Sequence, residues 1–587
     1  MRSSISDRLS KMDKRLLNVR FKKSTASIFV LFIIFIIVFF FHPFNELTTV
    51  NLQSYPNLVD SLKGNTVISD IKIKKCFYYS SCQLNKVEQL QWRRLDSPLE
   101  LYAAKPFRSL SRSMDIFNTF VFVKQASAQT VDSALVDVKI TLKGEPINDS
   151  NEGWVSTDYD SYTIWKKFIS KSHETFEQVD LVRDLDILFG MDDLQDSREY
   201  WQYQRTSIPV NAPVLPHLTL LKVPLTSHNK IFTEFHEFQS LKQNEVLLAK
   251  SNSLKIVQIS DLHIGPDTGF CLDSSIDCTA DLKSLEFLES SFEGESSSKP
   301  IDLVVITGDL IDSHRTKEFK SSILKSLSPI LSKKIPFIFT FGEMDEVPLY
   351  EDKPEDENSP DESDLKVDTI LKLNILNFIS SLPYCYNKFV RYNQNLHGLT
   401  NYNMKVFKMP VNEETQLKLD EPAAIITVLD SENHKIDSSQ INFLYRENQP
   451  LKSKDPFKLL FFHYPLPNYR PQGEFKLIGA YNDKKPLKKK TDMKFRDDIA
   501  SLGYQVVSVG HEYKNDLCLL SEKIDRNTVI NSMWLCYSSG AGASVGTSVD
   551  YDRKLRVFQI DFEKKQMLSW KRSALKGAFD HQMIHEY

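Results

Sequence analysis

The chain has 587 residues, of which 41% are hydrophobic and 26% are charged, and these values are typical of a globular protein with two or more domains. They exclude a chain that is disordered throughout. The net charge of -4 is uneven, because residues 1–23 carry eight Lys or Arg against two Asp, a net of +6. The rest of the chain carries -10, and a body of that sign has no obvious basic face for nucleic acid.

The basic tail 1–23 leads into an apolar segment. Residues Ala26 to Phe41 hold no charge, and Ser27 is their one polar residue. With its flanks in the interfaces, the segment 24–44 reaches the roughly 17 to 25 residues that a transmembrane helix needs. Lys and Arg on its amino side predict a cytosolic N-terminus. We therefore expect a single-pass signal anchor, with a cytosolic tail and a body in the secretory lumen or outside the cell.

Two alternatives to the anchor stay open, a cleaved signal peptide and a hydrophobic core helix. No small-x-small cleavage site follows the segment, where the chain reads "HPFNELTTV". A core helix next to such a tail would not be apolar on every face. Both observations favour the anchor.

The seven cysteines form three close pairs and one single residue. The pairs are Cys76 with Cys82, Cys271 with Cys278 and Cys518 with Cys536, and Cys385 is left over. In an oxidising lumen they can form three disulfides and one free thiol, whereas buried thiols of a cytosolic domain are the alternative. The sequence contains no C-x-x-C pair, which is the spacing typical of a structural zinc site. Asn148 begins the one glycosylation sequon, so a lumenal body would be a glycoprotein.

Residues 50–245 mix short aromatic or β-branched runs with polar turns, such as "ALVDVKITLKG" and "DLDILFG". This pattern predicts a strand-rich accessory domain, in which we find no catalytic motif.

From residue 250 to 575 the pattern changes to apolar strands separated by helical segments. The predicted strands are 254–260, 301–308, 335–342, 423–430, 458–465, 504–510, 533–539 and 555–562. "DLKSLEFLESSF" and "FKSSILKSLSPILS" repeat apolar residues at three and four positions, which predicts helices. Near-continuous apolar strands with helices between them predict an α/β fold whose sheet is covered on both faces. An acidic segment, 346–364, and a basic one, 482–490, are expected to be solvated insertions.

Polar side chains gather where five of these strands end. They are Asp261 and His263, Asp309, Glu343, His463 and His511, and a glycine precedes three of them. Ligands of open α/β sheets bind beyond the carboxyl ends of the strands. Carboxylate and imidazole together suit first-row divalent metals such as Mn, Fe or Zn.

The series "DLH", "GD", "GEMD", "FFHYP" and "GHEY" resembles the motifs of the calcineurin-like metallophosphoesterases. "VQISDLHIG", "KKIPFIFTFGEMDE" and "WLCYSSGAGA" resemble more closely the fungal dosage-dependent cell cycle regulator phosphatases, as a divergent yeast paralogue of the Sia type. The resemblance covers roughly residues 70–575 and is specific as an ordered set. It implies a sandwich of two mixed sheets flanked by helices, two bridged metals and hydrolysis of phosphomonoesters.

Carried over by position, the resemblance assigns Asp261 and His263 to the first metal and Asp309 to both metals. His463 and His511 would bind the second metal. Two such ions can clamp the attacking and leaving oxygens of a phosphate ester.

Three catalytic positions depart from the family pattern. Glu343 stands where the family has an asparagine ligand, and it adds negative charge to a phosphate site. Met344 stands where the family has the histidine that protonates the leaving oxygen, and a thioether has no proton to give. Asp345 would orient that histidine. Tyr513 replaces the last histidine ligand, and a phenol with a pKa near 10 is a poor ligand for a divalent ion.

Two functions follow from these residues. In the first, the site is degenerate, and the protein is a membrane-anchored regulatory pseudophosphatase that holds one divalent ion or none. In the second, it is an active phosphatase with an altered metal site. The pseudophosphatase would bind a phosphorylated or membrane partner through its cleft or accessory domain, and the active phosphatase would cleave a phosphorylated protein or a small phosphomonoester.

Other motifs are weaker. "GASVG" matches a serine-hydrolase elbow at Ser544, but the sequence that follows predicts a loop and a strand where the elbow needs a helix. The same glycines lack the helix of a dinucleotide loop. His314, His397 and His434 are isolated in the sequence and are expected to be ordinary surface or core residues.

Overall fold

The computed structural model describes residues 52–53, 55–77, 84, 88, 90–103, 117–147, 153–159, 161–191, 196–271, 278–297, 299–345, 362–389, 395–408, 421–448, 456–471, 475–483, 487, 494–526, 528–544 and 551–587. The predicted anchor 24–44, Cys82 and Asn148 lie outside these residues. The chain divides into two compact units, Met1–Leu52 with Glu357–Leu371, and Gln53–Asp356 with Lys372–Tyr587. The following paragraphs concern the second unit, except that α7 also begins in the first.

No helix in the described part of the chain is both long enough and apolar enough to span a bilayer.

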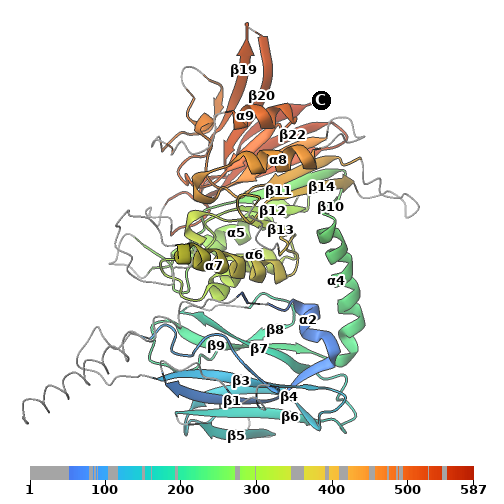
Figure 1. Ribbon diagram of the computed structural model, residues 1–587, viewed down its shortest axis with the longest axis vertical. Helices are drawn as coiled ribbons and strands as arrows, with labels where there is room; N and C mark the ends of the chain where they lie inside the picture. Colours follow the sequence, from blue (N-terminus) through green and yellow to red (C-terminus); the bar gives the residue numbers. More distant parts are fainter. Residues whose placement is uncertain are drawn as a thin grey trace, which may run out of the picture. The chain divides into compact units, whose positions relative to one another are not determined.

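The segment predicted to be strand-rich contains three antiparallel sheets of three strands each (Figure 1). Their orders are β1-β3-β2, β4-β6-β5 and β7-β9-β8. The strands are β1 (Thr66–Phe77), β2 (Trp92–Arg94), β3 (Phe117–Ser127), β4 (Ser133–Leu142), β5 (Trp154–Tyr159), β6 (Tyr162–Ser170), β7 (Leu181–Gly190), β8 (Trp201–Tyr203) and β9 (Leu215–Val223). Two helices flank them in sequence, α2 (Leu58–Leu62) and α4 (His228–Gln243). Apolar residues of β1, β3, β4, β6, β7 and β9 share one buried cluster, so the sheets pack on one another.

Two larger sheets follow in the chain. The six-stranded sheet has the order β13-β12-β11-β21-β22-β23, and the eight-stranded sheet has the order β10-β14-β15-β16-β18-β20-β19-β17. The first consists of β11 (Ser253–Ile259), β12 (Leu303–Thr307), β13 (Phe337–Thr340), β21 (Lys554–Asp561), β22 (Gln566–Ser573) and β23 (Gly577–Glu586). The second consists of β10 (Val246–Ala249), β14 (Tyr402–Lys408), β15 (Ala424–Val428), β16 (Phe457–Phe462), β17 (Leu477–Ile478), β18 (Val506–Val509), β19 (Cys518–Asp525) and β20 (Thr528–Tyr537).

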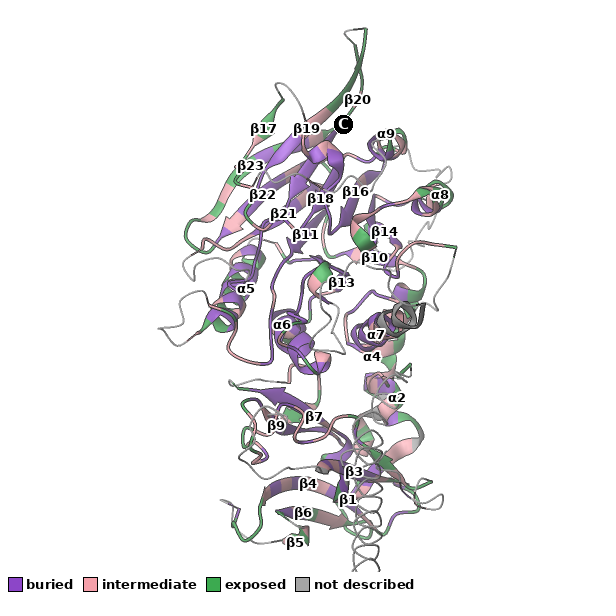
Figure 2. Ribbon diagram, turned by 60° about the vertical axis from the view of Figure 1, so that its left-hand side comes forward, coloured by how far each residue is buried: buried purple, intermediate pink, exposed green. Residues whose placement is uncertain are grey.

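These two sheets pack face to face with helices outside them. Apolar residues from both sheets share one buried cluster. A second cluster joins β11–β13 to α5 (Ala280–Ser296), α6 (Phe319–Ser332) and residues 373–379 of α7 (Glu362–Ser381). A third joins β16, β18 and β20 to α8 (Ser438–Glu447) and α9 (Phe495–Ser501). Every residue of β11, β12, β13 and β15 is buried, which explains why their sequences are mostly apolar; Figure 2 shows β11 among the buried strands.

The direction of the strands decides where the polar residues gather. β11, β12 and β13 are parallel neighbours, as are β15, β16 and β18. Parallel neighbours end at the same edge of their sheet. The polar residues after each trio of strands therefore meet at a common edge.

The eight predicted strands coincide with β11, β12, β13, β15, β16, β18, β20 and β21, and the two predicted helices coincide with α5 and α6. The pattern missed β10, β14, β17, β19, β22 and β23. α7 begins at Glu362, inside the segment 346–364 whose solvation stays a prediction. Residues 346–361 lie outside the described part.

Two disulfides join described cysteines, Cys271 to Cys278 and Cys518 to Cys536. Cys76 is also disulfide-bonded, and Cys385 is a buried free thiol.

Candidate metal centre

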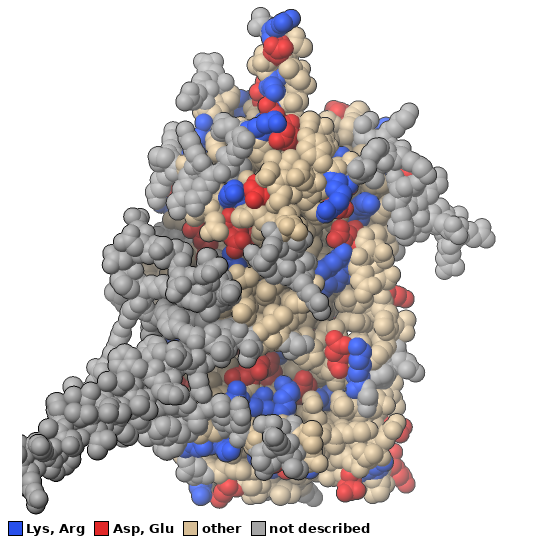
Figure 3. Space-filling view, in the orientation of Figure 1, with Lys and Arg blue, Asp and Glu red and all other residues tan. Residues whose placement is uncertain are grey.

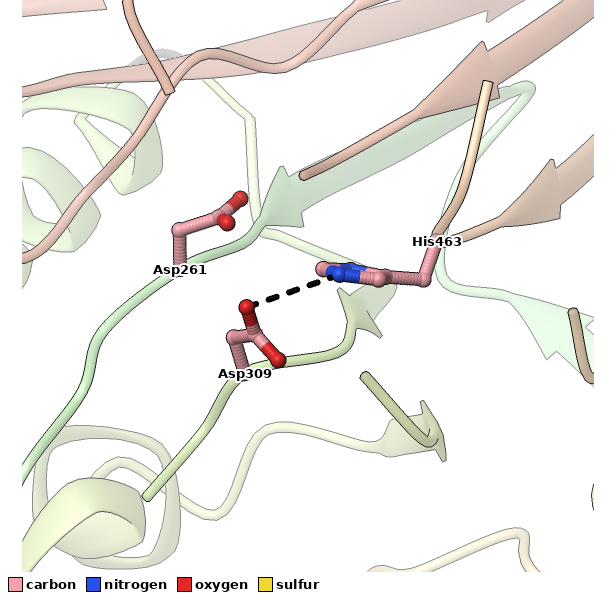
Figure 4. A group of neighbouring side chains, drawn as sticks. All are labelled: Asp261, Asp309 and His463. Atoms are coloured by element: carbon pink, nitrogen blue, oxygen red, sulfur yellow. Dashed lines mark ion pairs between the residues drawn. The ribbon is translucent and has the colours of Figure 1, made fainter. Parts of the chain in front are cut away.

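Asp261, Asp309 and His463 converge from the ends of β11, β12 and β16 (Figure 4). One ligand atom from each lies within 4.8 Å of the others. Nε2 of His463 lies 3.5 Å from Oδ2 of Asp309. All three side chains are buried, so the cluster brings two carboxylates and an imidazole together away from solvent.

The backbone turns sharply at these positions. Asp261, His263, Asp309 and His511 have positive φ angles of 55°, 51°, 53° and 65°. Residues other than glycine rarely adopt this conformation, and such residues concentrate at functional sites. The turns let polar side chains point inward just where the apolar strands end.

Gly308 and Gly342 allow the strand ends to approach one another. Gly308 has a φ of 83°, and a Cβ there would lie 2.6 Å from Nδ1 of His463. A Cβ on Gly342 would lie 2.2 Å from Oδ1 of Asp309. Both distances are shorter than any real contact, so a side chain at either position would displace the candidate ligands.

Hydrogen bonding prepares His463 to accept a cation. Its Nδ1–H donates to the carbonyl of Thr307 at 2.8 Å, which leaves the lone pair of the neutral ring on Nε2. Nε2 of His463 and Oδ1 of Asp261 are buried and have no hydrogen-bond partner in the described part of the chain. Buried polar atoms are normally satisfied, so these two orphans fit a ligand that is not made of protein. The donor set of oxygen and imidazole nitrogen fits a divalent metal.

The charged groups of the cluster shift one another's pKa values. Burial is the largest cause that raises the pKa of Asp261 to about 7; His463 lowers this pKa and the charge of Asp309 raises it. Burial alone would raise the pKa of Asp309, but His463 and His263 outweigh it and lower that pKa. The two carboxylates in turn raise the pKa of His463, although its burial acts against them. Perturbed groups that share one buried site are typical of functional centres.

Three further candidate ligands surround this cluster. Nε2 of His263 lies 3.6 Å from Oδ2 of Asp309 and 4.0 Å from Oδ1 of Asp261. The backbone N–H of His511 donates to Oδ2 of Asp261 at 3.1 Å. Nδ1 of His511 lies 3.7 Å from Oε1 of Glu343, whose side chain is 43% exposed. The six residues expected to bind metal therefore lie in one connected group, with Glu343 at its solvent side.

Met344 contacts the centre through its backbone. It lies in η4 (Glu343–Asp345), and its N–H donates to Oδ1 of Asp309 at 2.8 Å. The position where the family pattern has a histidine is therefore next to the central carboxylate, and it carries a half-buried thioether.

Asp345 holds the loop together. Its carboxylate accepts hydrogen bonds from the N–H groups of Asp309 (2.9 Å), Leu310 (2.7 Å), Ile311 (3.1 Å) and Gly342 (2.7 Å). Asp345 thus has a structural role that does not depend on an imidazole at position 344, a role that sequence reasoning missed.

Tyr513 lies near the centre without contributing a described ligand contact to it. Its carbonyl accepts hydrogen bonds from Ser539, Gly540 and Tyr551. Burial raises the pKa of its phenol, and the charges of Asp483 and Asp261 raise it further. A higher pKa makes the phenolate ligand still less accessible at neutral pH.

His434 belongs to this site, contrary to the expectation that it is an isolated histidine. Its Nε2 pairs with Oε1 of Glu343, and its ring centroid lies 6.0 Å from that of His511. His434 follows the end of β15, six residues after Val428. Because β15 is parallel to β16, the two strands end at the same edge of the sheet, and His434 comes to lie near His463. The polar run "DSENH" after an apolar strand was the signal that could have found it.

Ser544 has a structural role. Its hydroxyl donates to Oδ1 of Asp281 and accepts from the N–H of Phe270, each at 3.0 Å. The next described element is β21, the strand predicted there.

Comparison with known proteins agrees with this geometry. The family model "Calcineurin-like phosphoesterase" matches residues 254–512. The chain is 35% identical to Protein SIA1 of Kluyveromyces lactis over 340 residues, which are 56% of this chain and 50% of that protein. It is 27% identical to Phosphatase DCR2 of Saccharomyces cerevisiae over 70% of this chain and 68% of that protein. It is 24% identical to Probable inactive purple acid phosphatase 29 of Arabidopsis thaliana over 56% of this chain and 82% of that protein. The match thus spans half the length of the SIA1 protein.

Proposed function

Residues 254–512 form a calcineurin-like phosphoesterase domain, and from this premise we propose that the protein is a membrane-anchored, metal-binding pseudophosphatase with a regulatory role. It would recognise a phosphorylated protein or a small phosphomonoester and turn it over slowly or not at all. The observation that carries the proposal is Met344, which is adjacent to Asp309 at the position of the family's proton donor.

Of the two steps that the chemistry requires, the chain keeps the residues for metal binding and lacks the residue that protonates the leaving oxygen. Asp261, Asp309 and His463 would hold a divalent ion, with His263 and His511 beside them. When bound, such an ion supplies Lewis-acid stabilisation to a phosphoryl oxygen. The chain's own residues then have to protonate the leaving oxygen. A thioether cannot do so, and the loss of a general acid costs about 10² to 10⁴ in rate.

The alternative function is an active phosphatase with an altered metal site. The specific observation in its favour is the buried cluster itself, with unsatisfied ligand atoms on Asp261 and His463. A site without any ligand would leave those atoms at a cost to stability. The relatives are divided in the same way, since one is named a phosphatase and another a probable inactive phosphatase.

Turnover of an aryl phosphate by the purified full-length protein, with added Mn²⁺ or Fe²⁺, distinguishes the two functions. An aryl leaving group hardly needs a general acid, so this substrate gives an active site its best chance. We expect turnover that is equal to that of the Asp309→Asn variant or only slightly above it. Metal-dependent turnover that is absent from this control and reaches the roughly 1 to 10³ per second typical of enzymes would reject the pseudophosphatase.

The reverse experiment restores the family residues. The triple variant Glu343→Asn, Met344→His, Tyr513→His should gain metal-dependent turnover of an alkyl phosphate, because it recovers two neutral ligands and the proton donor that an alkoxide leaving group needs. If it stays inactive while binding metal as tightly as the unaltered chain, elements beyond these three positions are missing.

The membrane anchor rests on the sequence of residues 24–44 and the basic tail before it. A reporter at the C-terminus should be protected from protease in sealed microsomes and cleaved after detergent is added. Cleavage in intact microsomes would place the body in the cytosol.

The proposal includes no nucleic-acid partner. Among the coloured residues on the face drawn in Figure 3, Lys and Arg are interspersed with Asp and Glu, which supports this part of the proposal.

A further inference from the structure

His434 occupies the rim of the metal centre in a loop that no motif marks. The loop follows β15 and ends in η5 (Glu432–His434). The side chain is 13% exposed, and its Nε2 contacts Oε1 of Glu343. Its ring packs edge-on against Tyr464, the residue after His463, with centroids 4.2 Å apart.

The loop holds this imidazole in a conformation that is costly for the backbone. Asn433 and His434 both have left-handed φ angles, 55° and 59°. The N–H of Tyr464 donates to Oγ of Ser431 at 2.9 Å, which ties the loop to the end of β16. A pair with a side chain as exposed as Glu343 contributes little to folding stability. The stability gained from the Glu343–His434 contact does not account for the strained backbone of the loop. A role of this contact at the metal centre does.

A glutamate in this position needs a hydrogen-bond donor more than an asparagine does. It adds a negative charge beside Asp309 and Asp261, and its carboxylate can rotate about a longer side chain. An N–H donated to Oε1 fixes the orientation of that carboxylate and disperses part of its charge. A neutral imidazole suffices, because it always carries one N–H. Partners of this kind, hydrogen-bonded to a metal-binding side chain, commonly tune metal affinity by 10- to 100-fold.

We propose that Glu343 and His434 act as one unit in place of the asparagine of the family pattern. Glu343 contributes a ligand oxygen for a divalent ion, and His434 is the positioning residue that orients it. The inference rests on the proposed function only in requiring that the domain binds divalent ions, and it does not depend on turnover.

Titration calorimetry of the detergent-solubilised full-length protein with Mn²⁺ alone tests the unit. His434→Ala should weaken Mn²⁺ binding about 10- to 100-fold. His434→Gln should recover most of the affinity, because its amide can also donate to Glu343. The matched control is His314→Ala, which removes an exposed histidine of the loop after Asp309 and should leave the affinity unchanged.

The decisive measurement repeats the His434→Ala change in a Glu343→Asn background. If His434 acts through the carboxylate, its removal should change Mn²⁺ affinity less than twofold there. An equal loss in both backgrounds would overturn the inference, because His434 would then bind the ion or support the loop by itself. An unchanged affinity of the single His434→Ala variant would overturn it as well.

Two further measurements separate the possible failures. The midpoint of urea unfolding shows whether His434→Ala merely disrupts the fold, and we expect it to equal that of His314→Ala. If the unaltered protein binds no Mn²⁺, both the proposed function and this inference are rejected. If it binds Mn²⁺ and His434 has no effect on the affinity, the inference alone is rejected.

Discussion

The Asp345 carboxylate accepts hydrogen bonds from four backbone N–H groups, and these bonds determine the shape of the loop around Asp309. Buried donors left without an acceptor are costly, so these hydrogen bonds stabilise the loop. The residue therefore has a structural task in the loop that does not depend on the side chain at position 344.

Asp345→Asn should accordingly destabilise the protein by about 3 kcal/mol, since an amide has one oxygen and turns an N–H₂ toward backbone donors. The free energy of urea unfolding measures the effect. The exposed Asp132→Asn is the control, with an expected change within about 0.5 kcal/mol. Equal stabilities of the two variants would contradict the structural role of Asp345.

At the scale of elements, ion pairs connect the start of β19 to β21 and β22. Asp516, just before β19, accepts from Lys554 of β21 at 2.8 Å and from Lys571 of β22 at 2.9 Å. The N–H of Ala480 donates to the same carboxylate at 2.7 Å. Burial alone would raise the pKa of Asp516, but the two lysines outweigh it and hold the pKa at about 2.

This shift predicts a dependence of stability on pH. The pKa of an aspartate in the unfolded chain is about 3.9, so the folded state favours the charged form. The stabilisation, on the order of 2 to 3 kcal/mol, is fully present above about pH 4 and is lost as pH falls toward 2. Urea unfolding from pH 5 to pH 2 should show a steeper loss of stability for the unaltered chain than for Asp516→Asn. Parallel curves would contradict the assignment.

At the scale of the whole described unit, β7 and α6 are joined by buried charges. Nζ of Lys320 lies 2.7 Å from Oδ1 of Asp186, and Arg198 lies 3.4 Å from the other oxygen. Burial alone would raise the pKa of Asp186, but Lys320 and Arg198 hold it at about 2. The N–H of Phe189 in β7 also donates to Oγ of Ser321 in α6 at 2.8 Å. The three small sheets are thus connected to the two larger sheets through a helix that packs against β11–β13.

Asp186→Asn should therefore lower the stability of both parts together. Removing one partner of a buried ion pair costs about 3 to 5 kcal/mol, because it leaves the other charge uncompensated. Urea unfolding followed by tryptophan fluorescence should show one transition that moves to a lower midpoint. A second transition that does not move would mean that the two parts unfold independently.

The sequence by itself determined the strands and helices around the centre and the residues at five strand ends. This was possible because fully buried strands are continuously apolar and the turns that follow need glycine or polar residues. β22 and β23 were missed because their exposed and buried residues do not alternate regularly.

The tertiary structure alone decided which of these residues meet. Periodicity contains no information about strand pairing between distant segments, so it could not place His434 beside Glu343, 91 positions earlier in the chain. It also could not assign Asp345 to the backbone of Asp309–Ile311, because a carboxylate bound to N–H groups leaves no pattern in the sequence. The physical reason is the same in both cases: side-chain type follows from local burial, whereas contact follows from the order and direction of strands in the two sheets.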